Sequence, residues 1–260
     1  MKNLLVIKDD KKKLTKLSSF TNVILVGLFI LCIIIYTVIK LDYSFDFSVI
    51  AKYKVKFING YIMTLEICII SLFISLVIGL INALALKGKI IFFRFLARLY
   101  VEILRGTPFL VQVLFFYFII GEAFGLQNKF VVGFLILSFF SGAYVTEIIR
   151  GGIESIPQSQ LVTANSLGFT KAQTYRYIIF PQVFRRILPS LAGQLSSLIK
   201  DSSLLSVISI SEFTMKALEA NAITYQSYEI FSFLALGYLV ITIPVSLLSK
   251  WLERKYFYES

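Results

Sequence analysis

Residues 61–86 read YIMTLEICIISLFISLVIGLINALAL, a run in which Glu66 is the one charged side chain. A helix of about 20 apolar residues is long enough to cross the hydrocarbon core of a bilayer. The whole chain has the same character, because 57% of its residues are apolar and an ordinary soluble domain has about 45–50%. The sequence therefore predicts an all-α membrane protein.

Five further runs have the length and the apolar character of a membrane-spanning helix. They are residues 20–39, 109–126, 131–149, 188–210 and 230–248. The run at 20–39 is longer than the apolar part of a typical signal peptide and is followed by Lys-Leu-Asp-Tyr, which contains no small residues for cleavage. We therefore expect it to be retained, and the sequence predicts a polytopic protein with six transmembrane helices.

The distribution of basic residues predicts the orientation of these helices. The chain carries 26 Lys and Arg against 15 Asp and Glu, a formal charge of +11. If the N-terminus is cytoplasmic, 19 of the 26 basic residues lie in the cytoplasmic segments 1–19, 87–108, 150–187 and 249–260. Cytoplasmic loops of membrane proteins carry such an excess. Both termini are therefore predicted to be cytoplasmic, and no nucleic-acid partner is needed to explain the charge.

The composition excludes several kinds of catalytic site. The chain has no histidine, which removes His-containing catalytic triads and zinc sites. Its two cysteines, Cys32 and Cys68, lie inside apolar runs and are not at metal-ligand spacing, so no metal site is predicted. The sequence also lacks the Gly-x-x-x-x-Gly-Lys-Ser/Thr phosphate loop, so this chain is not itself an ATPase.

The longest predicted cytoplasmic segment, about residues 150–187, contains its own helix start and stop signals. Pro157 suits the first position of a helix, and Gly168 suits a C-terminal cap. Thr170 and Gln173 have the spacing of a capping box at the start of a second short helix, and Pro181 ends that pattern. Two such helices are too short to cross a membrane, so they are predicted to form a docking element for a soluble partner.

This segment resembles the EAA motif of bacterial ABC importer permeases. The motif runs Glu-Ala-Ala, three residues, Gly, nine residues and Ile-x-Leu-Pro, and the aligned positions here are Val162, Thr163, Ala164, Gly168, Ile178, Phe180 and Pro181. Val162 replaces the motif's Glu, Thr163 its first Ala and Phe180 its Leu, whereas the other positions match. The resemblance implies that the loop docks on a separate ATPase, without a charged contact from Val162.

Further segments resemble the polar amino acid permeases of this class, the histidine, glutamine, arginine and cystine type. They are residues 100–108, 143–153, 185–189 and 199–204, and the likeness covers about residues 58–255. It implies a five-helix core at 58–255, to which residues 1–57 add a basic tail, an extra helix and an outer linker. It also implies a bacterial plasma membrane, lipid around the helices and a second permease copy. The remaining implied partners are ATPase subunits that use ATP and Mg, and an extracellular or periplasmic amino acid binding protein.

Polar side chains inside apolar spans are costly in a bilayer and are therefore candidates for the translocation path. They are Glu66, Gln112, Lys200, Asp201, Ser202 and Ser203. Lys200 and Asp201 point about 100° apart on a helix, so separate partners or a local helix break are expected. They either meet the charged groups of a zwitterionic amino acid, or Lys200 reaches the outer surface while the serines bond backbone groups. Both alternatives stay open.

Two pairs of opposite charge are three residues apart near the inner ends of helices. Glu102 with Arg105 and Glu147 with Arg150 are predicted to form local ion pairs.

The alternative function is a secondary, ion-coupled transporter that works without an ATPase. Such transporters contain internal repeats with broken helices at matching positions, and we find no convincing repeat. The docking loop would also be unexplained. An intramembrane enzyme would need clustered carboxylates, histidines or a metal set, whereas the acidic residues here are scattered. We therefore expect a transport subunit without catalytic residues or a cofactor of its own.

Overall fold

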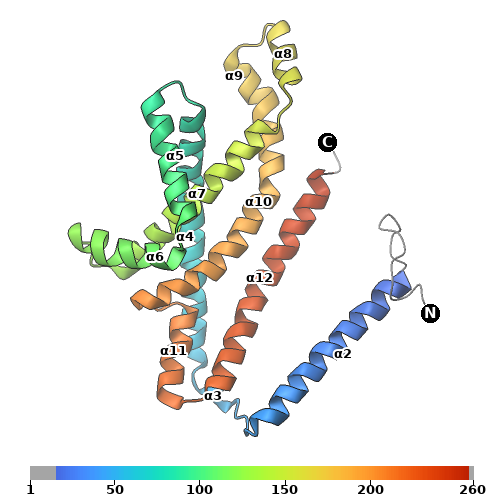
Figure 1. Ribbon diagram of the computed structural model, residues 1–260, viewed down its shortest axis with the longest axis vertical. Helices are drawn as coiled ribbons and strands as arrows, with labels where there is room; N and C mark the ends of the chain where they lie inside the picture. Colours follow the sequence, from blue (N-terminus) through green and yellow to red (C-terminus); the bar gives the residue numbers. More distant parts are fainter. Residues whose placement is uncertain (1–15, 258–260) are drawn as a thin grey trace. The chain divides into compact units, whose positions relative to one another are not determined.

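The structure is a computed structural model that describes residues 16–257. Every element in this range is a helix (Figure 1), as the sequence predicts. The chain divides into two units, Met1–Asp46 and Phe47–Ser260. The basic run at residues 11–13, part of the predicted cytoplasmic tail, lies outside the described residues.

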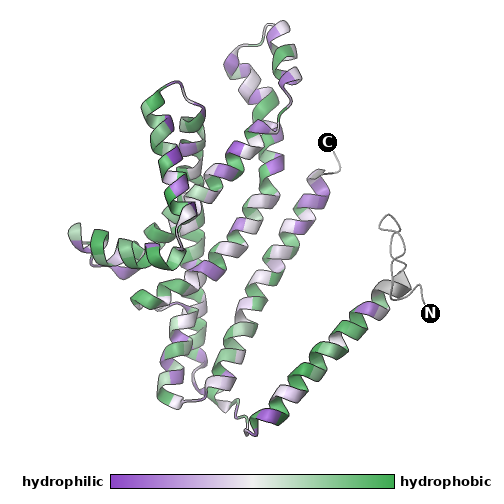
Figure 2. Cartoon of the chain, viewed as in Figure 1, coloured by the Kyte–Doolittle hydropathy of each residue, from purple (hydrophilic) through white to green (hydrophobic). Residues whose placement is uncertain are grey.

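The first unit contains helix α2 (Lys16–Leu41). Residues Phe20–Leu41 are apolar enough to span a membrane, and none of the tested window is buried inside the protein. In Figure 2 most of this helix is coloured as hydrophobic, with hydrophilic residues near its ends. A helix that is apolar all round and not buried in a protein core is typical of a membrane span, in agreement with the prediction for residues 20–39.

The second unit contains a helical bundle. In chain order its elements are α3 (Ser48–Lys52), α4 (Lys54–Lys87), α5 (Ile91–Gly106), α6 (Phe109–Phe115), a π-helical turn (Phe116–Gly121), α7 (Lys129–Glu154), α8 (Gln158–Ser166), α9 (Lys171–Thr174), a second π-helical turn (Tyr175–Ile179), α10 (Phe180–Asp201), a 3-10 helix (Ser202–Ile208), α11 (Phe213–Thr224) and α12 (Ser227–Phe257). Helix α4 packs along α7, and α10 packs on both α7 and α12.

Four helices of the described chain are long and apolar enough to cross a membrane. They comprise residues Phe20–Leu41, Lys54–Lys87, Lys129–Glu154 and Ser227–Tyr256. A fifth candidate exists if α5 and the helical segment Phe109–Gly121 together form one span, although they are bent by 111° relative to each other. The structure therefore confirms a polytopic helical protein with four or five apolar spans, and the predicted count of six is not confirmed.

The continuous span predicted at 109–126 is preceded by the helix on which Glu102 and Arg105 were expected, and this helix was not counted among the predicted spans. In the structure α5 occupies most of the segment 87–108, which was predicted to be cytoplasmic, and the chain then turns sharply into α6 (Figure 1). Four charged side chains lower the hydropathy of α5, so it does not stand out as an apolar run. The bend follows from Pro108, which cannot continue the hydrogen-bond ladder of α5 and requires an extended residue before it.

The span predicted at 188–210 is also shifted. Helix α10 begins at Phe180 and ends at Asp201, after which the chain tightens into the 3-10 helix and Ser209 adopts a left-handed conformation with φ of 59°. The local helix break considered for Lys200 and Asp201 is therefore present. Because α10 has 22 residues, it is about 33 Å long, enough to cross a bilayer, but it is amphipathic rather than uniformly apolar.

Small residues allow the helices of the bundle to approach closely. Gly79 lies where α4 crosses α7, and a methyl group at this position would overlap the side chain of Val145. Close approach at small residues is a common basis of helix association in membranes. This contact fixes α7, whose C-terminal end leads into the loop described next.

Candidate functional site

The segment between α7 and α10 is built around a glycine cap. The N–H of Gly168 donates to the carbonyl of Asn165, and the N–H of Phe169 donates to the carbonyl of Ala164, both at 3.0 Å. This pair of bonds is the Schellman motif, which requires a left-handed residue at the glycine position. Gly168 has φ of +76°. The predicted glycine stop at the end of the first short helix is therefore confirmed.

The second short helix begins at the predicted capping box. The side chain of Thr170 accepts a hydrogen bond from the N–H of Gln173, whose side-chain oxygen accepts one from the N–H of Thr170. Helix α9 then passes through the π-helical turn into α10. Pro181 therefore does not end the helix as predicted, because it lies in the first turn of α10, where a proline is tolerated. The loop is thus ordered by its own backbone and side-chain bonds at the point where the chain changes direction.

Side chains of the loop also anchor it to the bundle. Ile156, Ile179 and Val183 form a buried apolar cluster between the end of α7 and the start of α10. The amide of Gln182 on α10 donates to Gln160 on α8 at 2.7 Å. The cluster therefore joins the two ends of the loop, and the bond between Gln160 and Gln182 joins α8 to α10. We call residues 155–179 the coupling loop.

The residues predicted to serve coupling divide into inward-facing and exposed ones. Ala164 is buried in the loop, and Ile178 is half-buried, whereas Val162, Thr163, Gly168 and Pro181 are exposed. Val162 is 57% exposed and Leu167 is 71% exposed, so the loop presents apolar side chains on its outer surface. This exposed apolar surface suits a protein partner, and position 162 supplies apolar area where the related motif has an acid.

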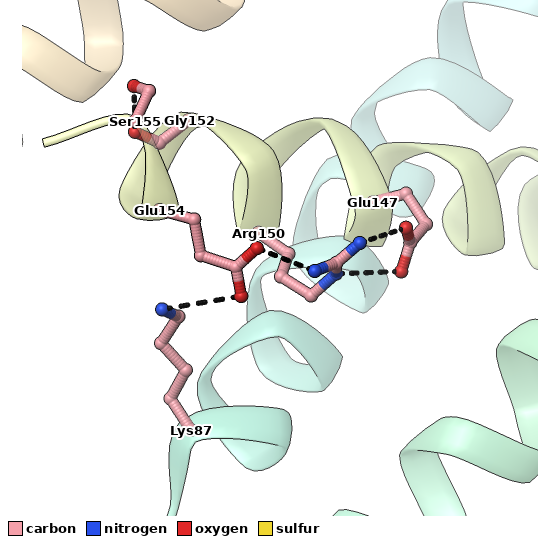
Figure 3. A network of polar contacts seen from close by, with 6 residues as sticks. All are labelled: Lys87, Glu147, Arg150, Gly152, Glu154 and Ser155. Atoms are coloured by element: carbon pink, nitrogen blue, oxygen red, sulfur yellow. Dashed lines mark hydrogen bonds and ion pairs between the residues drawn. The ribbon is translucent and has the colours of Figure 1, made fainter.

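Charged side chains connect the end of α7 to α4, as Figure 3 shows. The guanidinium of Arg150 donates to Glu147 through Nε at 3.0 Å and Nη2 at 2.7 Å, which confirms the predicted pair. Arg150 Nη1 also donates to Glu154 at 2.6 Å, and Lys87 Nζ at the end of α4 lies 3.6 Å from Glu154. The network joins α4 to α7.

The other predicted pair is not formed among the described residues. Arg105 of α5 instead lies 3.4 Å from Glu147 of α7. Glu147 lies on α7, which packs against α5. Arg105 therefore pairs with Glu147 of another helix and not with Glu102 of its own helix.

A cavity of about 750 Å³ lies between the last turns of α7, the first half of α10 and the last turns of α12. Its charged lining residues are Glu147, Arg185, Arg186 and Glu253, and the others include Gly151, Gly152, Ser155, Ser190, Gly193 and Ser249. The volume lies within the range of about 300–1,000 Å³ that is typical of small-molecule sites. Carboxylates and guanidinium groups together provide partners for both ends of a zwitterion.

This cavity was not predicted from the sequence. Its walls come from three separated parts of the chain. Arg185 and Arg186 were considered as cytoplasmic charges and as part of a segment that resembles the permeases, and Glu253 was not considered. The available signal was the presence of glycine and serine on facing helices, such as Gly152 and Ser249. Such small residues are typical of helix interfaces and of openings between helices in membrane proteins.

None of the predicted path residues lines this cavity. Glu66 is exposed on α4 and Lys200 is exposed near the end of α10. Asp201 is half-buried at the point where α10 ends. The hydroxyl of Ser202 donates to the carbonyl of Ile199 at 2.8 Å, and that of Ser203 donates to the carbonyl of Lys200 at 2.6 Å.

Gln112 is buried and holds the bend between α5 and α6. Its side-chain nitrogen donates to the carbonyl of Leu104 at 2.8 Å, to the carbonyl of Thr107 at 3.0 Å and to the hydroxyl of Thr107 at 2.8 Å. The amide nitrogen is therefore committed to the backbone that reverses direction around Pro108.

A second polar network, also not predicted from the sequence, joins α4, α11 and α12. The buried carboxylate of Glu212 accepts hydrogen bonds from the N–H groups of Thr214 at 2.9 Å and Met215 at 2.8 Å, and from the hydroxyl of Tyr238 at 2.9 Å. Thr64 of α4 lies 3.5 Å from the same carboxylate. Burial raises the pKa of Glu212, which lies outside the candidate spans, to about 7.

Within the described residues, no group of three or more His, Cys, Asp or Glu side chains is placed so that it could hold a metal ion.

Comparison with known proteins gives consistent matches over most of the chain. Residues 75–258 match the family described as binding-protein-dependent transport system inner membrane component. The glutamine transport system permease protein GlnP of Escherichia coli (strain K12) is 37% identical over 214 residues, which cover 82% of this chain and 98% of that protein. The arginine transport system permease protein ArtQ of Bacillus subtilis (strain 168) is 31% identical over 213 residues, 82% and 97% of the two chains.

A solved structure agrees with these relatives. A chain in the crystal structure of an amino acid ABC transporter with histidines is 36% identical, with a TM-score of 0.76, and the match covers 82% of this chain and 100% of that chain.

Proposed function

This chain belongs to the family of binding-protein-dependent transport system inner membrane components, and from that premise we propose that it is the permease subunit of an ATP-driven importer of polar amino acids. In this function the bundle forms the translocation path. A separate ATPase docks on the coupling loop and supplies the energy.

One observation carries the proposal: the coupling loop and the polar cavity share the same two helices. The loop joins the end of α7 to the start of α10, and the last turns of α7 and the first turns of α10 line the cavity. A partner that displaces the anchored loop therefore moves two walls of the cavity. This is the mechanical connection that alternating access requires, because a partner can shift the equilibrium only if it acts differently on the two states.

The chemistry of the cavity supports an amino acid substrate. Glu147 and Glu253 can accept hydrogen bonds from an ammonium group, and Arg185 and Arg186 can donate to a carboxylate. The two relatives described above are named for glutamine and arginine transport. We propose that the cavity receives the substrate on the loop side of the path, while Lys200, Asp201, Ser202, Ser203 and Glu66 remain candidates for its opposite part. Gln112 is instead assigned to the α5–α6 bend, which its side chain holds.

The distribution of charge supports a specific membrane topology. If the bent pair α5–α6 and the amphipathic α10 each cross once, the chain crosses six times, and residues 58–255 contribute five of these crossings. Both termini and the coupling loop then lie in the cytoplasm of a bacterium, on the side that holds 19 of the 26 basic residues. The extra span, α2, places the N-terminus on the cytoplasmic side and leaves the orientation of the five-helix core unchanged.

The proposed function requires partners. The exposed apolar side chains Val162 and Leu167 on the coupling loop provide a surface for the ATPase, which binds ATP and Mg in place of this chain. A second permease copy, identical or homologous, completes the path. An extracellular or periplasmic binding protein delivers the amino acid at the opposite end.

Affinity purification of the chain from its native membrane tests this function. We expect an ATPase and an amino acid binding protein to co-purify, and the ligand of the binding protein would identify the substrate. The Leu167→Asp variant removes apolar contact area from an exposed site, so it should lose the ATPase while retaining the fold. Purification of an active transporter without any ATPase would contradict the proposal and support an ion-coupled mechanism.

A further inference from the structure

A second opening in the bundle is apolar and lies on a different face of α10 from the polar cavity. It is a groove of about 370 Å³ whose walls come from the end of α4, the end of α7, the π-helical turn Tyr175–Ile179 and the start of α10. Its lining exposes almost no polar surface. An apolar cavity of about 150 Å³ can already hold a benzene molecule, so this groove has room for a longer hydrocarbon segment.

The groove lies near the end of a membrane span. Leu80 and Leu84 form part of its wall, and α4 ends at Lys87. At a rise of about 1.5 Å per residue, these leucines are about 5–10 Å along the helix axis from that end. With the coupling loop in the cytoplasm, as proposed above, the groove is level with the inner leaflet. The exposed side chains of Leu80, Leu84 and Phe184 then face lipid rather than water.

One charged residue lines the groove. Arg176 belongs to the π-helical turn, and its guanidinium lies 5.8 Å from the centre of the Tyr177 ring. No carboxylate partner of Arg176 is found within residues 16–257, and no acidic side chain lines the groove. A permanent positive charge beside an apolar groove is complementary to an anionic amphiphile. The anionic group of such a ligand meets the guanidinium, and its hydrocarbon part is removed from water in the groove.

We propose that this groove is a binding site for an anionic phospholipid of the inner leaflet, with one acyl chain between α4, α7 and α10 and the phosphate at Arg176. The inference rests on the proposed orientation of the coupling loop. The same groove is lined by Ile179 and Val183, which also anchor the loop. A bound lipid therefore stabilises the anchored position of the loop, and coupling depends on the anionic lipid content of the membrane.

Spin-labelled lipids in reconstituted vesicles test the binding directly. The purified complex is placed in phosphatidylcholine vesicles containing a trace of labelled phosphatidylglycerol or labelled phosphatidylcholine, and the immobilised fraction is measured without substrate or ATP. We expect the protein to prefer phosphatidylglycerol, and Arg176→Gln to reduce this preference about fivefold, the effect expected of one basic residue at an anionic surface. Lys171→Gln is the matched control, because Lys171 is an exposed base on the same segment outside the groove.

A second variant tests the apolar part of the site. Ala172 is exposed and lines the groove, so Ala172→Leu should fill part of it and reduce immobilisation of both lipids without unfolding the protein. Unchanged lipid preference in Arg176→Gln, an equal loss in Lys171→Gln, or full binding to Ala172→Leu would each overturn the proposal. Competition by free glycerol phosphate would also overturn it, by showing that the site binds a soluble phosphate instead. Because binding is measured without transport, a failure here leaves the permease function standing.

Discussion

At Gly168 the backbone of the coupling loop can be perturbed by adding a single methyl group. Its φ of +76° is unfavourable for any residue with a Cβ atom, yet a Cβ placed there would have no neighbour within 4 Å. Gly168→Ala therefore tests the backbone conformation alone, without a steric clash. We expect the Schellman cap to open more often, so that α8 loses its fixed orientation relative to α7 and α10.

The magnitude follows from the left-handed conformation. A residue other than glycine in this region costs about 1–2 kcal/mol, which corresponds to a factor of about 5–30 in the population of a two-state element. The Phe169 amide, which donates to Ala164 across the cap, should exchange its hydrogen faster by that factor. Amino acid uptake per ATP hydrolysed should fall, while ATP hydrolysis by the partner persists.

Gly27→Ala is the control for this experiment. A Cβ at Gly27 would likewise have no neighbour within 4 Å, but this glycine lies inside α2 with ordinary helical geometry. Alanine there should be neutral or stabilising by about 0.5–1 kcal/mol. Normal exchange at Phe169 and normal coupling in Gly168→Ala would refute the reasoning, and so would equal losses in both variants.

Three further perturbations test other parts of the molecule. Because the pKa of Glu212 is raised to about 7 from an ordinary value of about 4.5, the folded state binds this proton more tightly than the unfolded state. The contribution of Glu212 to the free energy of unfolding should therefore be greatest below pH about 4.5 and fall by up to about 3 kcal/mol as the pH rises through about 7. In Glu212→Gln this contribution should be missing from the difference in thermal stability between pH 5 and pH 8. Gly79→Ala forces a methyl group against Val145 and should lower the free energy of unfolding by about 1–3 kcal/mol, measured in detergent, whereas Gly27→Ala, with open space around it, should not. Gln112→Leu removes three hydrogen bonds at the α5–α6 bend and should cost about 1–3 kcal/mol without changing the KM for uptake; a changed KM would instead place Gln112 in the substrate path.

Local sequence signals predicted the features that depend on neighbouring residues. The long apolar runs identified α2, α4, α7 and α12, because a helix that spans a membrane needs about 20 predominantly apolar residues. Gly168 predicted the left-handed cap, and Thr170 with Gln173 predicted the capping box, because each motif is closed within a few residues. These motifs also defined the coupling loop.

Features assembled from distant segments were not predictable in the same way. Helix α5 is amphipathic and carries four charges, one of which pairs with Glu147 of another helix. The polar cavity combines residues 147–155, 185–193 and 249–256, and the small residues on these segments do not by themselves indicate that the segments meet. Glu212 and Thr64, separated by 148 positions, are brought together only by the packing of α11 on α4.

Uptake of a labelled amino acid by reconstituted vesicles tests the proposed permease function most directly. The chain is reconstituted with its co-purified ATPase and binding protein, with the binding protein outside and ATP inside. We predict uptake that requires the ATPase and hydrolysable ATP and is abolished when either is omitted. Uptake by this chain alone, driven by an ion gradient and unaffected by removal of the ATPase, would contradict this function.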